Sequence, residues 1–254
     1  MINLKNKLLK YKISFLKTYY KVTKQYYKSI YFKNKIIIDL DLREKIDRQI
    51  YFRNYYEDEL IKKTIQIISK NSFDYFFDVG CNLGIYSLLV AKENKEIKIL
   101  AYDIFEENII RMNKMISKNK FENIQTFSYG LSDKNIVKQA FTDHMNSTVF
   151  RLNKLDGLKY KVSKNVTLKK LDDIYPDLKN QYIFFKVDIE NHELFFIEGA
   201  KNIFSNNNIV VQIETNDEVV EQIHKKFKQY NLSLIKNINQ NWDKYYSNFE
   251  LKIN

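Results

Sequence analysis

Short apolar runs alternate along this chain with stretches whose apolar residues recur at helical spacing. The apolar runs, which predict strands, are residues 36–40, 75–79, 97–102, 124–129, 182–187 and 209–213. The helical stretches are 59–69, a segment ending at residue 92, 108–118 and 217–230, with terminal strands after them. Near-continuous apolar strands are typical of a parallel sheet covered on both faces. The alternation therefore predicts an α/β fold with a doubly wound sheet.

Two segments fall outside this alternation. Residues 134–176 lack a clear helical pattern, so we expect an inserted hairpin or lid between the third and fourth strands of the large domain. The first 38 residues are rich in Lys, Tyr and Phe, and their apolar residues recur near helical spacing. We therefore expect a basic N-terminal helical extension over residues 1–70 and one large domain over residues 71–254.

Acidic residues stand at the carboxyl ends of four predicted strands. Asp78 lies at the end of the first strand of the large domain, and Asp103, Asp188 and Glu214 follow three others. Ligands of open α/β sheets bind outside these strand ends. Asp103 also lies nineteen residues after Gly84, which is the layout by which such a sheet holds the ribose of a cofactor.

The turn after the first strand carries Gly80 and Gly84, with Cys81 and Asn82 between them. In a dinucleotide-binding turn a middle glycine lets the backbone approach a pyrophosphate. Here a diphosphate would meet side chains, and Asp78 places negative charge near the helix N-terminus, where a phosphate would otherwise sit. Both features favour a cationic cofactor, and S-adenosylmethionine has the ribose, ammonium, sulfonium and carboxylate groups that this layout can bind.

The formal net charge of +11 is concentrated at the N-terminus, because ten lysines and no acid precede Asp39. This basic segment, residues 1–38, could dock on anionic lipid, on a polyanionic glycan or on a partner. The alternative is a solvated helix packed on the large domain or on a second copy of the chain. The single cysteine excludes an internal disulfide. With no apolar run of membrane-spanning length and no signal-peptide pattern, we expect a cytoplasmic protein, at the inner membrane face if the segment docks on lipid.

Four spaced motifs occur in one order along the chain. They are D-V-G-C-N-L-G-I-Y-S at 78–87, G-L-S-D at 130–133, a threonine-leucine-acidic stretch at 167–173 and K-V-D-I-E-N-H-E at 186–193. In this combination the chain resembles the FkbM family of S-adenosylmethionine-dependent O-methyltransferases. It departs from the family where Cys81 and Gly130 replace alanines, Asp103 replaces a glutamate and Asn191 replaces a glycine.

The resemblance implies a Rossmann-like class I methyltransferase fold and methyl transfer to a sugar hydroxyl. The acceptor expected from it is a nucleotide-linked sugar or a glycan of surface (capsule) polysaccharide biosynthesis. The expected cofactor-binding residues are Glu57, Asp78, Gly80, Cys81, Asn82, Gly84, Asp103, Ser132 and Asp133. Asp103 would hold the ribose, residues 80–84 the methionine end, Ser132 or Asp133 the adenine edge, and Glu57 the amino group.

Methyl transfer from a sulfonium is an in-line displacement, so an oxygen nucleophile must be held against the methyl group and relieved of its proton. The catalytic candidates are Asp188, His192, Lys186 and Glu214. Asp188 or His192 would act as the base, and Lys186 would stabilise the developing alkoxide. Glu190 and, from the insertion, His144 would contact the substrate. Clusters of Asp and Glu also suit magnesium, so the need for a divalent metal is left open.

Two other functions stay open. The positive charge suggests a nucleic-acid methyltransferase, but enzymes that methylate base amino groups commonly carry a proline-containing motif after the fourth strand, and Pro176 is the only proline. The absence of that motif does not bear on RNA ribose methylation, which stays an alternative. The lysine-rich segment also suits a membrane-docked binding module with a vestigial cofactor site, although the intact Asp78, Asp103 and Glu190 argue against that.

Overall fold

The computed structural model describes residues 11, 14–16, 18–20, 22–143, 150–152, 160–239 and 243–252. The chain forms two compact units, residues 1–58 and residues 59–254. The second unit contains the sheet that the sequence predicts. The domain boundary expected at residue 70 stays a prediction; helix α3 (Asp58–Lys70) ends at that residue.

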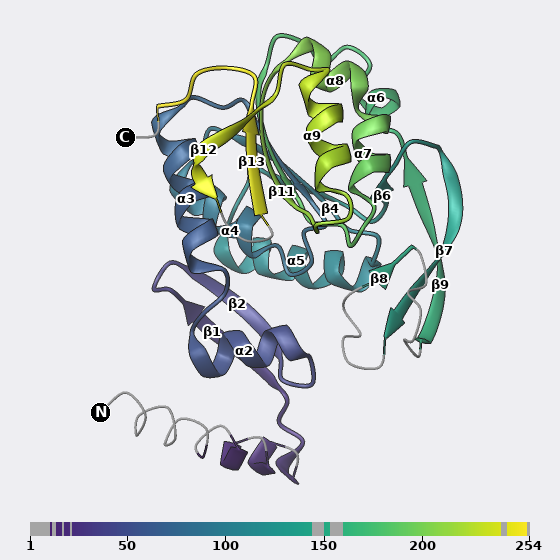
Figure 1. Ribbon diagram of the computed structural model, residues 1–254. Helices are drawn as coiled ribbons and strands as arrows, with labels where there is room; N and C mark the ends of the chain where they lie inside the picture. The colour runs from purple at the N-terminus through teal and green to yellow at the C-terminus, as the bar shows by residue number, and fades with distance from the viewer. Residues whose placement is uncertain are drawn as a thin grey trace. The chain divides into compact units, whose positions relative to one another are not determined.

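A seven-stranded sheet forms the centre of the second unit (Figure 1). In spatial order its strands are β12 (Ser233–Asn239), β13 (Asp243–Ser247), β11 (Asn208–Glu214), β10 (Tyr182–Val187), β3 (Tyr75–Val79), β4 (Lys98–Tyr102) and β5 (Ile124–Phe127). Neighbouring strands from β11 to β5 are parallel, whereas β13 is antiparallel to both β11 and β12. The strand order reverses between β3 and β10, and such a switch point opens a crevice for ligands. The predicted doubly wound α/β sheet is confirmed.

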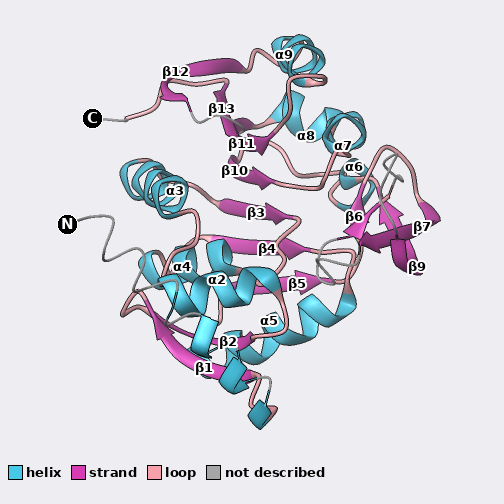
Figure 2. Cartoon of the chain, turned by 60° about the horizontal axis from the view of Figure 1, so that its bottom comes forward, coloured by secondary structure: helices cyan, strands magenta, loops and turns pink. Residues whose placement is uncertain are grey.

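Helices cover both faces of this sheet (Figures 1 and 2). One face carries α3, α4 (Ile85–Glu93) and α5 (Glu106–Asn119). The other carries α6 (Leu171–Ile174), α7 (Glu193–Gly199), α8 (Lys201–Asn206) and α9 (Val220–Lys228). Because both faces are covered, the central strands are apolar along almost their whole length, and in β10 every residue after Tyr182 is buried.

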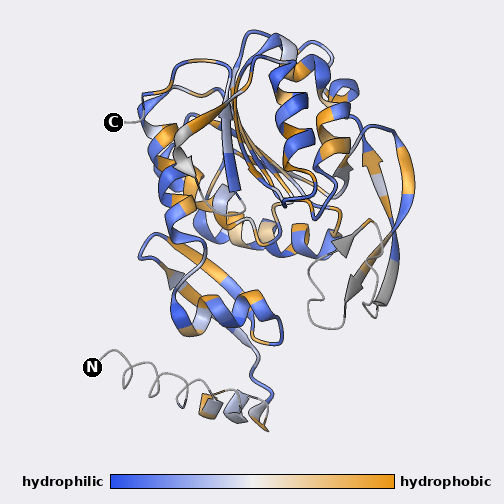
Figure 3. Ribbon diagram, viewed as in Figure 1, coloured by the Kyte–Doolittle hydropathy of each residue, from blue (hydrophilic) through white to orange (hydrophobic). Residues whose placement is uncertain are grey.

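The core on the side of α7 to α9 is built largely from aromatic rings. Phe77 of β3 lies 4.8 Å from Phe185 of β10 and stacks on Tyr102 of β4 at 6.2 Å, measured between ring centres. Phe185 in turn contacts Phe204 of α8. Figure 3 shows these inner strands and the inward faces of the helices in the hydrophobic colour. Burial of each such side chain contributes about 1.5–3 kcal/mol to the stability of the fold. This packing holds the strand ends that carry the acidic residues in place.

The insertion between β5 and β10 forms a small four-stranded sheet in the order β6-β9-β7-β8. Its strands are β6 (Gly130–Leu131), β7 (Ile136–Asp143), β8 (Phe150–Arg151) and β9 (Tyr160–Lys169). β7 and β9 pair as a long antiparallel hairpin, so the inserted hairpin predicted from the sequence is confirmed. The pattern did not predict α6, because four residues are too few to show helical periodicity.

The first unit contains an antiparallel hairpin of β1 (Tyr27–Phe32) and β2 (Ile36–Asp41), followed by α2 (Lys45–Arg53). The described residues between 11 and 23 are helical. The sequence predicted β2 but not β1, whose residues are mostly exposed or half-buried and so show no apolar run. Of the helices in the described ranges, none has the length and apolar character that crossing a membrane requires.

Candidate functional site

The glycine turn after β3 is shaped by two backbone hydrogen bonds and one close approach. The N–H groups of Gly80 and Cys81 both donate to the carbonyl of Tyr102 at 2.9 Å, which joins the turn to β4. Gly80 has a φ of +80°, and a Cβ there would lie 1.9 Å from the carbonyl oxygen of Asp188. Glycine is therefore required where the ends of β3 and β10 meet. Gly84, with a φ of +70°, begins α4.

Asp78 is buried near the end of β3, with 1% of its surface exposed. Its Oδ2 accepts hydrogen bonds from the hydroxyl and the N–H of Ser87 in α4, at 2.6 and 3.3 Å. Burial raises the pKa of the Asp78 carboxyl, although the Lys186 ammonium acts in the opposite direction. Among the described residues, neither Asp78 Oδ1 nor the buried Oδ1 of Asn82 in the same turn has a hydrogen-bond partner.

Asp103 follows β4 and accepts hydrogen bonds from the glycine turn, from the residues after β4 and from α5. Its Oδ1 accepts a 2.7 Å hydrogen bond from the N–H of Phe105, and its Oδ2 accepts from the N–H of Asn82 at 2.9 Å and from the amide of Asn108 at 3.3 Å. Burial raises the pKa of Asp103 to about 6, although these hydrogen bonds lower it. A carboxylate offers about four acceptor positions, so roughly one is left for a ligand hydroxyl.

Lys186, Asp188 and Glu214 form a charged group at the ends of β10 and β11. Lys186 is buried, and its Nζ lies 3.1 Å from Asp188 Oδ2 and 5.2 Å from the centre of the Tyr86 ring. Burial opposes ionisation of Asp188, but Lys186 and a hydrogen bond from Glu214 hold its pKa below the usual value. The Asp188 charge raises the pKa of the exposed Glu214 to about 9. At neutral pH this pair therefore shares one proton and carries one negative charge.

A cavity of about 190 Å³, here called the strand-end cavity, opens at the ends of β10 and β11. It is lined by Glu190, Asn191, Glu193, Glu214, Thr215 and Asn216. Burial raises the pKa of Glu193 to about 7, and its Oε1 accepts a 3.1 Å hydrogen bond from the N–H of Asn191. Asn191 has a φ of +70°, a conformation that asparagine tolerates, so it can stand where the family pattern has glycine. The described lining contains three glutamates and no lysine or arginine.

His192, at the start of α7, is 5% exposed and contacts Ser132 after β6. The Ser132 hydroxyl donates to Asp133 Oδ1 at 3.1 Å and lies 2.9 Å from His192 Nε2. A hydroxyl has one hydrogen, so Ser132 must accept from His192 Nε2–H, which leaves Nδ1 unprotonated. Nδ1 is buried and has no hydrogen-bond partner in the described part of the chain. Burial, followed by the nearby Lys138, lowers the pKa of His192 to about 4.

The structure thus brings together the residues of the glycine turn with Asp103 and, beside them, Asp188 with Lys186 and Glu214. Ser132 and Asp133, expected at the adenine, directly adjoin His192, expected in catalysis. The role of Glu57 stays a prediction, because Glu57 belongs to the first unit. The substrate contact expected of His144 also stays a prediction, because His144 lies outside the described residues.

Four residues of the strand-end cavity were not predicted as site residues from the sequence: Asn191, Glu193, Thr215 and Asn216. The signal for the last two was present, because five polar residues in a row, Glu214 to Glu218, follow the apolar run of β11. Asn216 also fixes the opposite wall of the cavity, since its amide donates to Asn191 Oδ1 at 2.6 Å.

The question of a metal was left open by the sequence. Within the ranges that the structure describes, no group of three or more His, Cys, Asp or Glu side chains is arranged to hold a metal ion. The charge of Asp188 is balanced by Lys186 at 3.1 Å. The residues described here therefore give no support to a magnesium site.

The residues at the ends of β3 and β4 fit S-adenosylmethionine. Asp78 Oδ1 and Asn82 Oδ1 are buried acceptors without partners in the described chain, and an ammonium group would supply donors to them. Asp103 has capacity for a ribose hydroxyl. The N-terminus of the nine-residue helix α4 offers backbone N–H groups for a carboxylate. A cationic ligand is also compatible with the acidic residues that surround the crevice.

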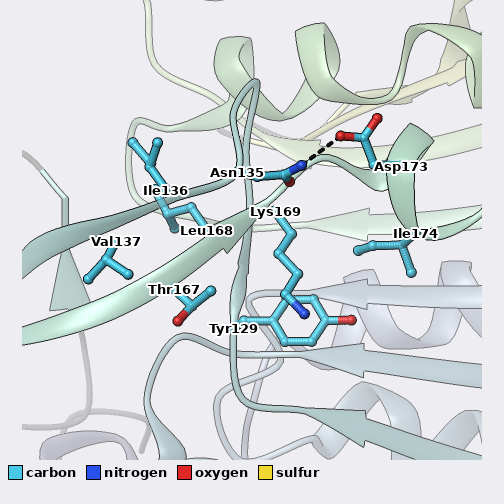
Figure 4. A pocket seen from close by; sticks show the side chains of 9 residues that line it. All are labelled: Tyr129, Asn135, Ile136, Val137, Thr167, Leu168, Lys169, Asp173 and Ile174. Carbon is cyan, nitrogen blue, oxygen red and sulfur yellow. Dashed lines mark hydrogen bonds between the residues drawn. The ribbon is translucent and has the colours of Figure 1, made fainter.

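A larger cavity of about 600 Å³, here called the hairpin cavity, lies at the base of the inserted hairpin (Figure 4). It is lined by Tyr129, Asn135, Ile136, Val137, Thr167, Leu168, Lys169, Asp173 and Ile174. Lys169 points at the face of the Tyr129 ring, with its Nζ 4.3 Å from the ring centre. The carbonyl of Lys169 accepts a 2.9 Å hydrogen bond from the N–H of Ser132, which connects this cavity to the residues around His192.

A sequence model of the methyltransferase FkbM domain matches residues 78–240, from Asp78 through the glycine turn, the insertion and the strand-end acids. The chain belongs to this family. The FkbM family assigned from the motifs is therefore confirmed, and the chain is an S-adenosylmethionine-dependent methyltransferase by family and fold.

Several solved structures are similar to this FkbM domain at low sequence identity. Pyrococcus horikoshii PH0793 is 12% identical, with 95% of this chain and 83% of that chain covered and a TM-score of 0.50. The METTL16 methyltransferase domain is 12% identical, with 87% of this chain and 92% of that chain covered and a TM-score of 0.49. M. jannaschii TYW2 in complex with AdoMet is 9% identical, with 88% of this chain and 84% of that chain covered and a TM-score of 0.48. A comparison with curated protein sequences finds no significant match.

Proposed function

We propose that this FkbM domain transfers a methyl group from S-adenosylmethionine to a sugar hydroxyl. The acceptor is a nucleotide-linked sugar or a glycan of surface polysaccharide biosynthesis. Membership of the family supports the methyl transfer. The observation that carries the choice of a hydroxyl acceptor is the Asp188–Glu214 pair, because it combines an ionised carboxylate with a cavity lined by hydrogen-bonding side chains.

Asp188 is the base in this proposal. S-adenosylmethionine, when bound, supplies an electrophilic methyl group on a sulfonium. The acceptor oxygen forms the new bond to carbon, the carbon–sulfur bond breaks with its electrons, and Asp188 takes the hydroxyl proton. Lys186 holds the Asp188 carboxylate in place at 3.1 Å and keeps it ionised. His192 is the weaker candidate, because its Nε2–H is used by Ser132 and its Nδ1 is buried.

The strand-end cavity favours a neutral polyol as the group that is methylated. Glu214 keeps its proton up to a pH of about 9 and donates it to Asp188, so its other carboxyl oxygen can accept a hydrogen bond from a sugar hydroxyl. Glu190, Glu193, Thr215 and Asn216 provide further polar groups for neighbouring sugar hydroxyls. The same acidic lining would repel a phosphate backbone, so it argues against RNA ribose methylation at this cavity.

The experiment is transfer of labelled methyl from S-adenosylmethionine to a panel of nucleotide sugars and oligosaccharides, with random RNA as the rival acceptor. We expect label in at least one sugar, attached to oxygen, and none in RNA. Asp188→Asn should lower kcat about 100-fold or more, which is the usual contribution of a positioned base. Its dissociation constant for S-adenosylmethionine should change only a few-fold.

Glu218→Gln is the matched control, because Glu218 is exposed and follows the same strand but does not line the cavity. This variant should keep the parental kcat. Equal kcat in Asp188→Asn and the parental enzyme would remove Asp188 as the base. Label found in RNA, or on nitrogen, would contradict the proposed acceptor.

A further inference from the structure

The hairpin cavity contains hydrogen-bond donors that have no partner. The Lys169 ammonium is half-buried, lies over the Tyr129 ring at 4.3 Å and forms no ion pair within the described chain. The hydroxyl groups of Tyr129 and Thr167 likewise form no hydrogen bond with any residue that the structure describes. In Figure 4 the Lys169 side chain extends over the Tyr129 ring, and Thr167 lies to one side of this pair.

The single carboxylate in the lining is already occupied. Asp173 Oδ2 accepts a 2.7 Å hydrogen bond from the Asn135 amide, and Asp173 Oδ1 lies 3.4 Å from Lys170 Nζ. Asn135 is used a second time, because its Oδ1 accepts from the N–H of Lys170 at 2.8 Å. The charge of Asp173 is therefore balanced without Lys169, and the groups left over are one cation and two hydroxyl groups. Such a set suits an oxyanion.

Apolar side chains form the rest of the cavity. Val137 is 68% exposed and Ile136 is 42% exposed, and Ile174 lies on the side of α6 (Figure 4). The volume of about 600 Å³ is in the range of small-molecule sites, roughly 300–1,000 Å³. A ligand with an anionic group and an apolar or aromatic portion would therefore match the cavity better than a bare inorganic ion.

The two cavities differ in charge, and a series of hydrogen bonds relates their lining residues. The strand-end cavity has three glutamates and no cation in its described lining, whereas the hairpin cavity presents Lys169. The Lys169 carbonyl accepts a hydrogen bond from the N–H of Ser132, and the Ser132 hydroxyl is hydrogen-bonded to His192. Asn191 and Glu193, which precede and follow His192 in the chain, line the strand-end cavity. An acceptor with a neutral sugar at one end and a phosphate at the other complements both cavities.

We propose that the hairpin cavity binds the phosphate-bearing part of the acceptor, with Lys169 as counter-ion and Tyr129 and Thr167 as hydrogen-bond donors. This assignment rests on the proposed function and narrows it to sugars carried on a phosphate or diphosphate. A nucleotide-linked and a lipid-linked sugar share this group. They differ in what would contact Ile136, Val137 and Ile174: a base and ribose, or an alkyl chain.

The test is calorimetric titration of the cofactor-free full chain with pyrophosphate, uridine diphosphate and dodecyl diphosphate. We expect all three to bind, and tighter binding of one of the two organic diphosphates identifies the carrier. Lys169→Met should weaken binding at least about tenfold, as expected for loss of a charge-assisted contact of about 1.5–3 kcal/mol. Thr167→Val should weaken it less. Lys134→Met removes an exposed charge from the same insertion, outside the cavity, and should leave affinity unchanged.

Equal affinity of Lys169→Met and the parental chain, or no binding of any of the three probes, would overturn the assignment. Kinetics separate this result from failure of the proposed function. With a phosphate-bearing acceptor, Lys169→Met should raise KM and leave kcat unchanged, because the contact is the same in the ground and transition states. Methyl transfer to sugars with no effect of Lys169→Met on KM would reject the subsite alone, whereas diphosphate binding without methyl transfer to any sugar would reject the function alone.

A second, independent feature is an exposed stripe in the first unit, here called the N-terminal stripe. It consists of Tyr11, Phe15, Tyr19 and Val22, which are 67%, 71%, 45% and 76% exposed. Their spacing of four, four and three residues places them on one face of the helical segment. Tyr20 on another face is buried against Tyr51 of α2, with the two hydroxyl groups 3.0 Å apart. Tyr20 thus attaches the helix to α2, and no residue that the structure describes covers the N-terminal stripe.

We infer that the N-terminal stripe docks on an anionic lipid surface. Ten lysines and no acid precede Asp39, and lysine with aromatic residues is the composition that lies at a membrane interface. Each Lys near an anionic surface contributes about 1 kcal/mol, and the buried aromatic rings add an apolar contribution. A polyanionic glycan would use the lysines but would leave the stripe in water, so the stripe favours lipid.

Flotation of the full chain with phosphatidylcholine vesicles, with and without phosphatidylglycerol, tests this inference. We expect binding only to the anionic vesicles, and replacement of all four stripe residues by alanine should weaken it at least tenfold. Tyr31→Ala with Tyr55→Ala is the matched control, since both are exposed aromatics of the first unit outside the stripe. Absence of binding to anionic vesicles, or equal binding by the four-alanine variant, would overturn the inference.

Discussion

The backbone N–H of Asn82 donates a 2.9 Å hydrogen bond to the carboxylate of Asp103. This bond ties the glycine turn after β3 to the segment that follows β4. Asp103 therefore shapes the turn and, with its remaining acceptor capacity, is available to a cofactor hydroxyl. One carboxylate thus couples the local geometry of the turn to cofactor binding, and this coupling can be measured.

Asp103→Asn should weaken binding of S-adenosylmethionine about tenfold to hundredfold. The neutral amide loses a charged acceptor for the N–H of Asn82 and for the ribose, and hydrogen bonds to charged groups contribute about 1.5–3 kcal/mol. Calorimetric titration measures the change, and Glu122→Gln, an exposed residue of the same half of the sheet, serves as the control. Unchanged affinity in Asp103→Asn would show that this carboxylate does not contact the cofactor.

Gly80→Ala and Gly84→Ala should differ in severity. A Cβ at Gly80 would lie 1.9 Å from a backbone oxygen, whereas a Cβ at Gly84 would meet the flexible side chain of Met112 at 2.4 Å. Both positions have positive φ, so both variants carry backbone strain. We expect a loss of at least about 3 kcal/mol in the free energy of unfolding for Gly80→Ala and a smaller loss for Gly84→Ala. Denaturant unfolding compares them, and equal losses would refute the assigned close approach.

Glu214 should make the folded state less stable as pH rises. Its pKa in the folded state is about 9, above the ordinary value of 4.5. The stabilisation that comes from binding this proton is therefore fully present below pH 4.5 and is lost as the pH rises through about 9. Glu214→Gln, which resembles the protonated acid, should flatten the dependence of the melting temperature on pH between 5 and 9, whereas Glu218→Gln should not. The same slope in Glu214→Gln and the parental protein would contradict the pairing with Asp188.

His192 should stay neutral and keep one tautomer through the mildly acidic range. Burial and Lys138 lower its pKa to about 4, and its Nε2–H is used by Ser132. Nitrogen NMR of labelled histidine should therefore show a protonated Nε2 and a bare Nδ1, unchanged when the pH falls from 7 to 5. Titration of His192 near pH 6.5 would contradict this and would restore it as a strong candidate for the base.

The central sheet could be predicted because its strands are buried on both faces. In each of β3, β10 and β11 all interior positions but one are apolar, the exceptions being Asp78, Lys186 and Gln212, so the pattern is visible without any knowledge of neighbours. The position of Asp78, Asp103, Asp188 and Glu214 at one edge followed from the parallel arrangement alone. β1 could not be predicted, because its residues are mostly exposed and the strand is defined by pairing with β2.

Contacts between distant segments could not be predicted from the sequence. Ser132 and His192 are 60 residues apart and meet only because β6 pairs with the end of β9 beside α7. The Lys169–Tyr129 contact depends on the same pairing, so neither residue was singled out by the sequence. The proton shared by Asp188 and Glu214 likewise depends on their contact, because the Asp188 charge is the largest cause of the raised pKa of Glu214.

Titration of the full chain with S-adenosylmethionine and, separately, with a pyridine dinucleotide tests the central claim most directly. We predict saturable one-to-one binding of S-adenosylmethionine, weakened by Asp103→Asn, and no binding of the dinucleotide. Binding of the dinucleotide in preference to S-adenosylmethionine, or of neither, would contradict the assignment of the crevice between β3 and β10 to a cationic methyl donor.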